Sequence, residues 1–152
     1  MNKLDTFRKF LTEKGYRPTV RDDYMTFQHE GGQYVLPIDT DDPHYFRIVF
    51  PNFWHFDTPA ERTRVLETAA TITGMVKAVK IFPGPNDTIA SIDMLLPNEE
   101  TFCEFFPRAL LMLQHACHEF ARAMHAREPG NPVLEALKKL FGGGEGEIEG
   151  PS

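Results

Sequence analysis

The chain has 152 residues, of which 41% are hydrophobic and 25% charged, with a formal net charge of -6. These are the proportions of one ordinary globular domain that can bury a core. Its 16 basic residues are scattered among 22 acidic ones, so we expect neither a nucleic acid nor an anionic membrane as partner. No apolar run approaches the ~20 residues that span a bilayer. Residues 1–10 carry several charges where a secretory signal is apolar, so we expect a cytoplasmic protein.

The first 38 residues predict a helix followed by a β-hairpin. In 2–14 apolar residues recur at three- and four-residue spacing, as on one side of an amphipathic helix. Residues 24–29 and 33–38 alternate between two faces and flank Gly31-Gly32, which predicts two strands joined by a tight turn. Because Pro37 has no N–H to donate, its end of the second strand is expected at a sheet edge.

A third strand is predicted over 44–50, and residues 51–57 are expected to form a loop that is dense in aromatic residues. The helix that follows has a clear start at Thr58-Pro59-Ala60-Glu61, a capping box with proline in the first helical position. Such a start stabilises a helix by about 1 kcal/mol. Apolar spacing continues this helix to the neighbourhood of Gly74.

Two strands and the longest helix complete the predicted domain. The strands cover 77–82 and 88–96 and flank a turn rich in proline and glycine. The helix is expected over 98–126, with its apolar residues in register on both sides of Pro107. Proline removes one backbone hydrogen bond, so we predict a single helix bent at that residue.

The remainder of the chain is expected to lie outside the domain formed by residues 1–126. Residues 127–141 read as a linker followed by a short amphipathic helix over 132–141, which is too short to be stable unless it packs on another surface. It could pack on its own domain, on a partner or on a second subunit. Residues 142–152 form an acidic, glycine-rich tail with too little apolar content to fold.

The two cysteines, Cys103 and Cys117, fall in the same predicted helix. Fourteen residues at the helical rise place them roughly 21 Å apart, which is beyond the reach of a disulfide. Neither has a CxxC spacing, so we expect free, mostly buried thiols in a reducing compartment.

The order of elements predicts an α+β fold, α-β-β-β-α-β-β-α, with an antiparallel sheet packed against helices. Four phrases carry a family resemblance: FLTEKGY at 10–16, YVLPID at 34–39, DPHYFRI at 42–48 and VKAVKIF at 76–82. With them the chain resembles the bacterial YbjN family, labelled sensory transduction regulators, which shares the architecture of class I type III secretion chaperones. The resemblance covers about residues 3–126. It implies regulation or chaperone-like binding and no defined reaction.

Four large aromatic residues lie within seven positions: Phe50, Phe53, Trp54 and Phe56. One interpretation is that they seal the junction between the sheet and the second helix, because aromatic side chains usually lie inside. The other is an exposed anchor patch for a partner peptide, since tryptophan is favoured at binding hot spots. The candidate partner-binding residues are therefore Phe53, Trp54 and Phe56.

Leu111 is the fourth candidate partner-binding residue. It falls on the polar side of the last helix, about 150° from the centre of the apolar stripe at 100° per residue. The same side carries three histidines and an arginine, namely His115, His118, His125 and Arg122. An apolar residue there leaves room for a dimer contact, and we expect a homodimer.

Neither cluster of metal-binding residue types has the pattern of a metal site. Asp39, Asp41 and Asp42 lack the glycine and the distal glutamate of a calcium loop, so a solvated turn is expected. His115 and His118 have helical spacing, but no HExxH pattern accompanies them. We therefore predict no metal and no cofactor.

No catalytic motif is present: the sequence contains no GxSxG, P-loop, GxGxxG or HExxH pattern. We therefore expect no catalytic residues and predict a non-catalytic, chaperone-like or regulatory protein-binding module. It would capture a peptide or protein partner along its sheet edge and hydrophobic grooves. The alternatives are a small-molecule sensor or enzyme with a pocket between sheet and helices, and a purely structural subunit.

Overall fold

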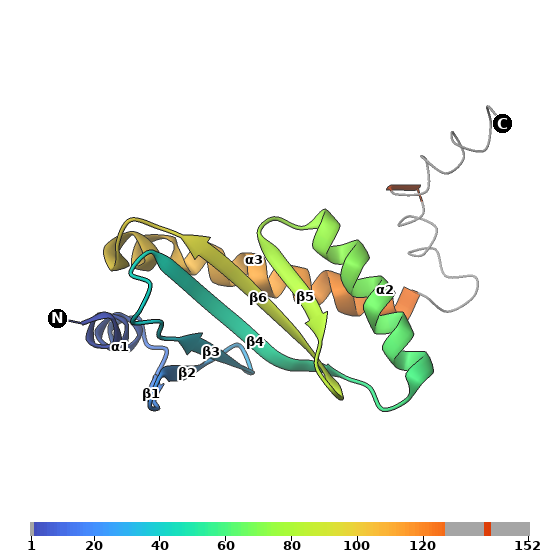
Figure 1. Cartoon of the computed structure of the whole chain (residues 1–152), viewed down its shortest axis with the longest axis horizontal. Helices are drawn as coiled ribbons and strands as arrows, with labels where there is room; N and C mark the ends of the chain where they lie inside the picture. The colour runs from blue at the N-terminus through green and yellow to red at the C-terminus, as the bar shows by residue number, and fades with distance from the viewer. Residues whose placement is uncertain (1, 127–138, 141–152) are drawn as a thin grey trace.

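The computed structural model describes residues 2–126 and 139–140. Residues 2–126 form an antiparallel sheet of six strands in the order β1-β2-β3-β4-β6-β5, packed against three helices (Figure 1). The elements are α1 (Lys3–Glu13), β1 (Thr19–Val20), β2 (Tyr24–His29), β3 (Gly32–Pro37), β4 (Tyr45–His55), α2 (Pro59–Met75), β5 (Val79–Pro83), β6 (Asp87–Leu95) and α3 (Glu99–Ala126). The α+β fold with an antiparallel sheet is confirmed, although the sequence did not predict the two-residue strand β1. The linker, most of the short helix and the tail predicted after 126 lie outside the described residues.

Helix α3 runs along one face of the sheet and supplies the largest share of the core (Figure 1). Its buried side chains are Phe102, Phe106, Ala109, Leu110, Leu113, Ala116, Cys117, Phe120, Ala123, Met124 and Ala126. Phe102 stacks on Phe46 of β4, with ring centroids 5.0 Å apart, and Phe106 lies 5.5 Å from Phe27 of β2. The apolar register on both sides of Pro107 belongs to one uninterrupted helix, as the sequence predicts.

Helices α2 and α3 begin at side-chain caps, and the sequence predicted the first of them. Thr58 Oγ1 accepts a hydrogen bond from the backbone N–H of Glu61 at 3.1 Å, which confirms the predicted start of α2. Asn98 Oδ1 accepts one from the N–H of Thr101 at 2.8 Å at the start of α3. Each cap satisfies an N–H that the first helical turn leaves without a partner. No helix among the described residues has both the length and the apolarity to cross a membrane.

The β2–β3 hairpin turns at Glu30 and Gly31, one residue earlier than the sequence suggested. Both residues have positive φ, 48° and 80°, and the flanking pair is His29 with Gly32. Two consecutive left-handed residues make the tight turn whose twist matches that of paired strands. Gly32 is therefore a strand residue.

Pro37 lies in an interior strand, which corrects the expectation of a sheet edge. β3 has β2 on one side and β4 on the other. Ile38 donates its N–H to Asp23 O on the β2 side, at 2.9 Å. Successive backbone groups of a strand point in opposite directions, so the nitrogen of Pro37 faces β4. The missing donor therefore interrupts the ladder between β3 and β4, where Val35 pairs with Val49.

Residues 51–55 of the segment expected to be a loop belong instead to β4, so the expectation was wrong for them, whereas residues 56 and 57 lie outside the strand. Phe50 pairs with Ala90 and Trp54 pairs with Thr88, so β4 contains two more residues than β6 over this stretch. Asn52 has a φ of 56°, in the left-handed region. Extra residues in one strand make a bulge, which turns the side chains beside it without ending the strand.

One edge strand of the sheet is short, and the other is bordered by a helix. β1 has two residues and pairs only with Met25 and Thr26 of β2, and β5 is bordered by α2. The backbone N–H of Ile81, on the outer side of β5, donates to Thr73 Oγ1 of α2 at 3.0 Å. Pro83 at the end of β5 has no N–H to donate. These two features limit the addition of a strand along β5.

The acidic segment before β4 is a turn, as the sequence predicts. Asp39 Oδ1 accepts hydrogen bonds from the N–H groups of Asp41 and Asp42, at 3.0 and 3.1 Å. A side chain that binds the backbone two residues ahead of it is typical of such turns.

A buried lysine ties α1 to this turn. Lys3 is 7% exposed, and its Nζ donates to the backbone oxygens of Asp39, Asp42 and Tyr45 at 3.1, 3.2 and 2.7 Å. The same Nζ lies 4.3 Å from the ring centroid of Phe46. Burial lowers the pKa of Lys3, and nearby carboxylates oppose that shift. Three carbonyl acceptors match the three N–H donors of the ammonium group.

Replacing Lys3 tests how much this contact contributes to folding. Lys3→Met should lower the free energy of unfolding by about 2–4 kcal/mol, because three partly buried carbonyls lose their donor. Lys9→Met, at an exposed position of the same helix, should change it by less than about 0.5 kcal/mol. Urea unfolding of both variants makes the comparison, and equal stabilities would show that the contact contributes nothing.

Candidate functional site

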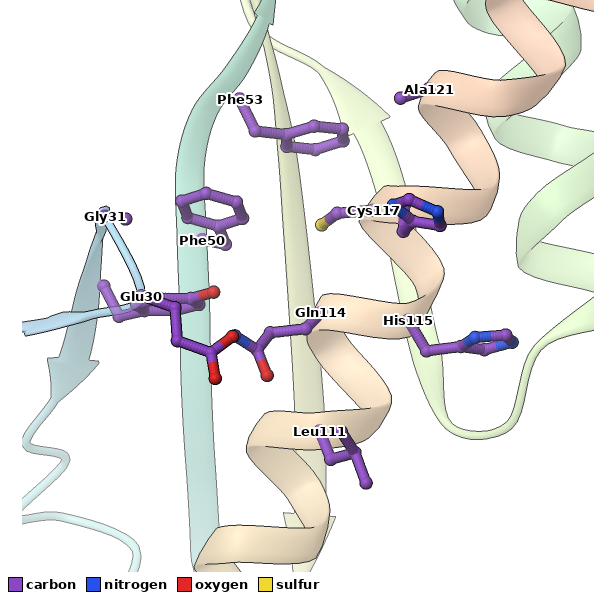
Figure 2. Close-up of a pocket in the computed structure, with 12 residues that line it drawn as sticks. Glu30, Gly31, Phe50, Phe53, Leu111, Gln114, His115, Cys117 and Ala121 are labelled. Atoms are coloured by element: carbon purple, nitrogen blue, oxygen red, sulfur yellow. The ribbon is translucent and has the colours of Figure 1, made fainter.

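An open groove lies between the β2–β3 hairpin, β4 and α3 (Figure 2). Its volume is about 640 Å³. The hairpin and sheet contribute Glu30, Gly31, Gly32, Tyr34, Phe50 and Phe53, and α3 contributes Leu111, Gln114, His115, Cys117, His118 and Ala121. We call it the aromatic groove, because phenyl and phenol rings form its floor.

The floor is a ladder of parallel rings. Tyr34 stacks on Phe50 with centroids 4.5 Å apart and an interplanar angle of 20°. Phe50 stacks on Phe53 at 5.7 Å and 15°. Below Tyr34 the ladder continues into the core through Phe27, at 5.4 Å. Tyr34 and Phe50 therefore each stack on two rings, whereas Phe53, at the end of the ladder, stacks on one.

Gly32 makes room for this ladder. A Cβ at that position would lie 3.1 Å from Cε1 of Phe50 and 3.2 Å from Cε2 of Tyr34. These separations are shorter than the ordinary contact between carbon atoms. The strand backbone can therefore approach the stacked rings only because the residue has no side chain.

A polar contact closes the hairpin end of the groove. Gln114 donates from Nε2 to Oε2 of Glu30 at 3.1 Å, which joins α3 to the hairpin turn. Burial raises the pKa of Tyr34, while its hydrogen bond with Gln114 acts in the opposite direction. The Glu30 side chain itself is 73% exposed. None of the twelve lining residues, all of which the structure describes, is Lys or Arg.

Cys117 is the one thiol in the groove wall, and it is not arranged as a nucleophile. Figure 2 shows its side chain directed toward the sheet, while His115 points away from it. Burial raises the pKa of Cys117 to about 12. The thiolate is the reactive form, and reactive cysteines have lowered pKa values. The neighbouring His118 therefore does not make this a Cys-His site of the activated kind.

The four residues singled out from sequence occupy different environments. Phe53 lines the groove and meets Phe120 of α3 edge to face at 5.3 Å. Trp54 is partly buried against the same ring, at 5.8 Å. Phe56 is 2% exposed and belongs to the core, so it cannot act as a surface anchor. Leu111 is 65% exposed and lines the groove.

Trp54 and Phe56 therefore fit the interpretation that these aromatic residues seal the sheet against a helix. Phe53 fits both that interpretation and the anchor patch, because it packs on α3 and also lines the groove. The seal forms mainly against α3, whereas the sequence suggested α2. On the side of α2, the guanidinium carbon of Arg62 lies 5.8 Å from the centroid of the Phe56 ring.

Sequence reasoning missed Glu30, Gly32, Tyr34 and Gln114 as groove residues. The alternation of β3 indicated that Tyr34 faces the core, yet nothing local connects it to α3. Gln114 and Glu30 are 84 positions apart. Their proximity depends on the docking of α3, so it leaves no signal in either segment alone.

A second groove, of about 510 Å³, lies on the other side of Leu111. It is lined by Met75, Val76, Lys77, Leu111, Met112 and His115. Leu111 and His115 thus form a ridge between two grooves. Across the described residues no three His, Cys, Asp or Glu side chains are grouped so that they could hold a metal ion.

Two glycines provide a test of the ring ladder. Gly32→Ala should lower the free energy of unfolding by about 1–3 kcal/mol, because the new methyl group displaces Phe50. Gly74→Ala should raise it by about 0.5–1 kcal/mol, since this helical glycine has open space around it and alanine favours helix. Chemical denaturation would measure both, and shifts of the same sign would contradict the packing described.

The thiols provide a second test. Burial raises the pKa of Cys103 to about 11 and that of Cys117 to about 12. A raised pKa reduces the thiolate fraction, so at about pH 8 iodoacetamide should alkylate either residue at least about a hundredfold more slowly than free cysteine. Unfolding in urea should restore the ordinary rate. Fast alkylation of folded protein at Cys117 would indicate an activated thiol.

No family model matches the sequence, and no curated protein does. Solved structures are similar in fold. YbjN from E. coli, a proposed transcription regulator, has a TM-score of 0.58 and 15% identity, covering 79% of this chain and 92% of that one. An uncharacterized protein from Methanothermobacter thermautotrophicus has a TM-score of 0.51 and 7% identity, covering 81% and 99%. This chain therefore has a YbjN-like fold, as its sequence resemblance predicts.

Proposed function

We propose that this protein is a non-catalytic binding module that holds a segment of a partner protein in the aromatic groove. The observation that carries the proposal is an open groove lined by the stacked rings of Tyr34, Phe50 and Phe53 and by the exposed Leu111. Its role would be regulatory or chaperone-like. YbjN is itself described as a proposed transcription regulator.

The size and shape of the groove suit a side chain of a partner better than an enclosed metabolite. A volume near 640 Å³ is within the range of ligand sites, but this groove is open along its length. Burying one large apolar side chain there would contribute about 1.5–3 kcal/mol. Several such contacts along an extended or helical segment are needed for stable capture, as in other groove-binding proteins.

The groove is a better candidate than the sheet edges. Addition of a strand needs a row of free backbone groups. The N–H of Ile81 on β5 already donates to Thr73, and β1 has two residues. Side chains in the groove would therefore supply the affinity, with main-chain pairing in a minor role.

An enzyme is the less supported alternative. General acid–base or nucleophilic chemistry needs a titratable group with a pKa tuned toward the working pH. In the groove the pKa values of Cys117 and Tyr34 are raised away from neutrality, so neither the thiol nor the phenol is prepared as a nucleophile or base.

A homodimer and a cytoplasmic location remain predictions that accompany this proposal. The second groove supports the dimer, because it places the exposed Met75 and Leu111 beside Met112 on one surface. Methionines adapt to different partners, so such a surface can pack against another chain.

A pair of leucine substitutions tests groove binding. Peptides selected from a random phage-displayed library on the folded protein should bind wild type and Leu66→Glu alike. They should bind Leu111→Glu at least about tenfold more weakly, because a charge then occupies the groove rim. Leu66 is the matched control, as a 46% exposed leucine of α2 that lines neither groove.

Two outcomes would contradict the proposal. One is a selection that returns no binders to the folded protein, and the other is a set of binders with equal affinity for both variants. Circular dichroism would confirm that each variant is folded. Sedimentation equilibrium of the same samples would show whether Leu111→Glu also changes the oligomeric state.

A further inference from the structure

We infer that the segment held in the aromatic groove carries an aromatic side chain next to an arginine or lysine. This inference rests on the proposed function and specifies the chemistry of its partner. Two features carry it: the charge at the hairpin end of the groove, and the orientation of the rings on its floor.

Glu30 gives the groove a negative end. Its carboxylate is 73% exposed, and no Lys or Arg lines the groove to neutralise it. Oε2 accepts from Gln114 at 3.1 Å, and Oε1 lies 3.8 Å from His29 Nε2. A carboxylate has about four acceptor positions, so capacity remains for a guanidinium or ammonium group.

The hairpin holds this carboxylate in position. Glu30 and Gly31 occupy the two left-handed positions of the turn, and Gln114 binds the side chain from α3. An acceptor that is already oriented loses less freedom when a ligand binds. The net charge of -6 on the whole chain also attracts basic partners in general.

The rings favour an incoming aromatic side chain. Tyr34 and Phe50 each stack on two other rings, so these two offer mainly their edges to a ligand. Ring edges carry partial positive charge and prefer the face of another ring. The core already contains this arrangement, because Phe53 and Phe120 meet at 81°. The basic residue pairs with Glu30, because a charge-assisted hydrogen bond to a carboxylate is stronger than the attraction of a cation to a ring face.

The two features are neighbours along the groove. Figure 2 shows Glu30 beside Gln114 of α3, with Phe50 and then Phe53 progressively farther along the groove and Leu111 on the other side of Glu30. A basic residue and its aromatic neighbour can therefore contact both features together. An acidic neighbour would instead face Glu30 and be repelled.

Three nonapeptides test this chemistry, identical except for a central Arg-Phe, Glu-Phe or Arg-Leu pair in an alanine and serine background. Fluorescence anisotropy would give their affinities for the full chain at about 50 mM and about 300 mM salt. At low salt the Arg-Phe peptide should bind about tenfold more tightly than the Glu-Phe peptide, and this ratio of affinities should be smaller at high salt. The Arg-Phe peptide should bind about three- to tenfold more tightly than the Arg-Leu peptide at both salt concentrations.

Protein variants assign the preference to the groove. Glu30→Gln should reduce the advantage of Arg-Phe over Glu-Phe to about twofold or less, and Glu30→Lys should reverse its sign. Glu13→Gln, an exposed carboxylate of α1 outside the groove, should leave the preference unchanged. Circular dichroism checks the fold of each variant.

The outcomes separate this inference from the function on which it rests. If all three peptides bind wild type alike and Leu111→Glu weakens all of them, groove binding stands and the basic–aromatic preference is wrong. A preference that persists in Glu30→Lys also overturns the inference. If none of the three peptides binds wild type, groove binding itself is contradicted, and the inference falls with it.

Discussion

The packing of phenylalanine rings between α3 and the sheet is the interaction on which the rest of this structure depends. Phe102 packs between Phe7 of α1 and Phe46 of β4, with centroids 4.9 and 5.0 Å away. Farther along, Phe106 contacts Phe27 and Phe120 contacts Phe53. Phenylalanine needs no hydrogen-bond partner, so these contacts fix the rotation of the helix by shape. That rotation determines that Gln114 and Leu111 line the groove.

Two polar contacts hold α1 and β5 to the elements beside them. Lys3 ties α1 to the turn before β4, and Thr73 occupies a backbone donor on the outer side of β5. Backbone donors and acceptors that are already paired cannot form a new sheet with another chain. The aromatic groove differs from such an edge, because it presents side chains between elements.

The sequence predicted those parts of the fold that depend on local periodicity and on capping residues. The register of α3 across Pro107 and the capped start of α2 at Thr58 follow from nearby residues. The bulged strand was missed, because Pro51 and Asn52 favour a turn while pairing with β6 decides the outcome. Thr88 supports this pairing by donating from its hydroxyl to Trp54 O at 2.9 Å. Tertiary pairing overrode local preference there.

The candidate site was less predictable because its parts meet only in the folded chain. Phe53 and Leu111 were anticipated separately, for different reasons, and neither expectation contained the hairpin. The contact between Glu30 and Gln114 spans 84 positions. A periodic pattern reports which face of an element is buried, but it carries no information about which exposed residues become neighbours.

The groove separates residues that maintain the fold from residues that can set its specificity. Tyr34 and Gly32 cannot change freely, because one is buried and the other admits the ring ladder. Glu30 and Leu111 are exposed and contribute little to the core, so substitutions there cost little stability. If the groove binds a partner segment as proposed, a packed aromatic floor with exchangeable residues at its rim would let one scaffold accept different segments, since specificity is a difference of affinities. Changes of specificity would then fall on the rim and leave the packing of the floor unchanged.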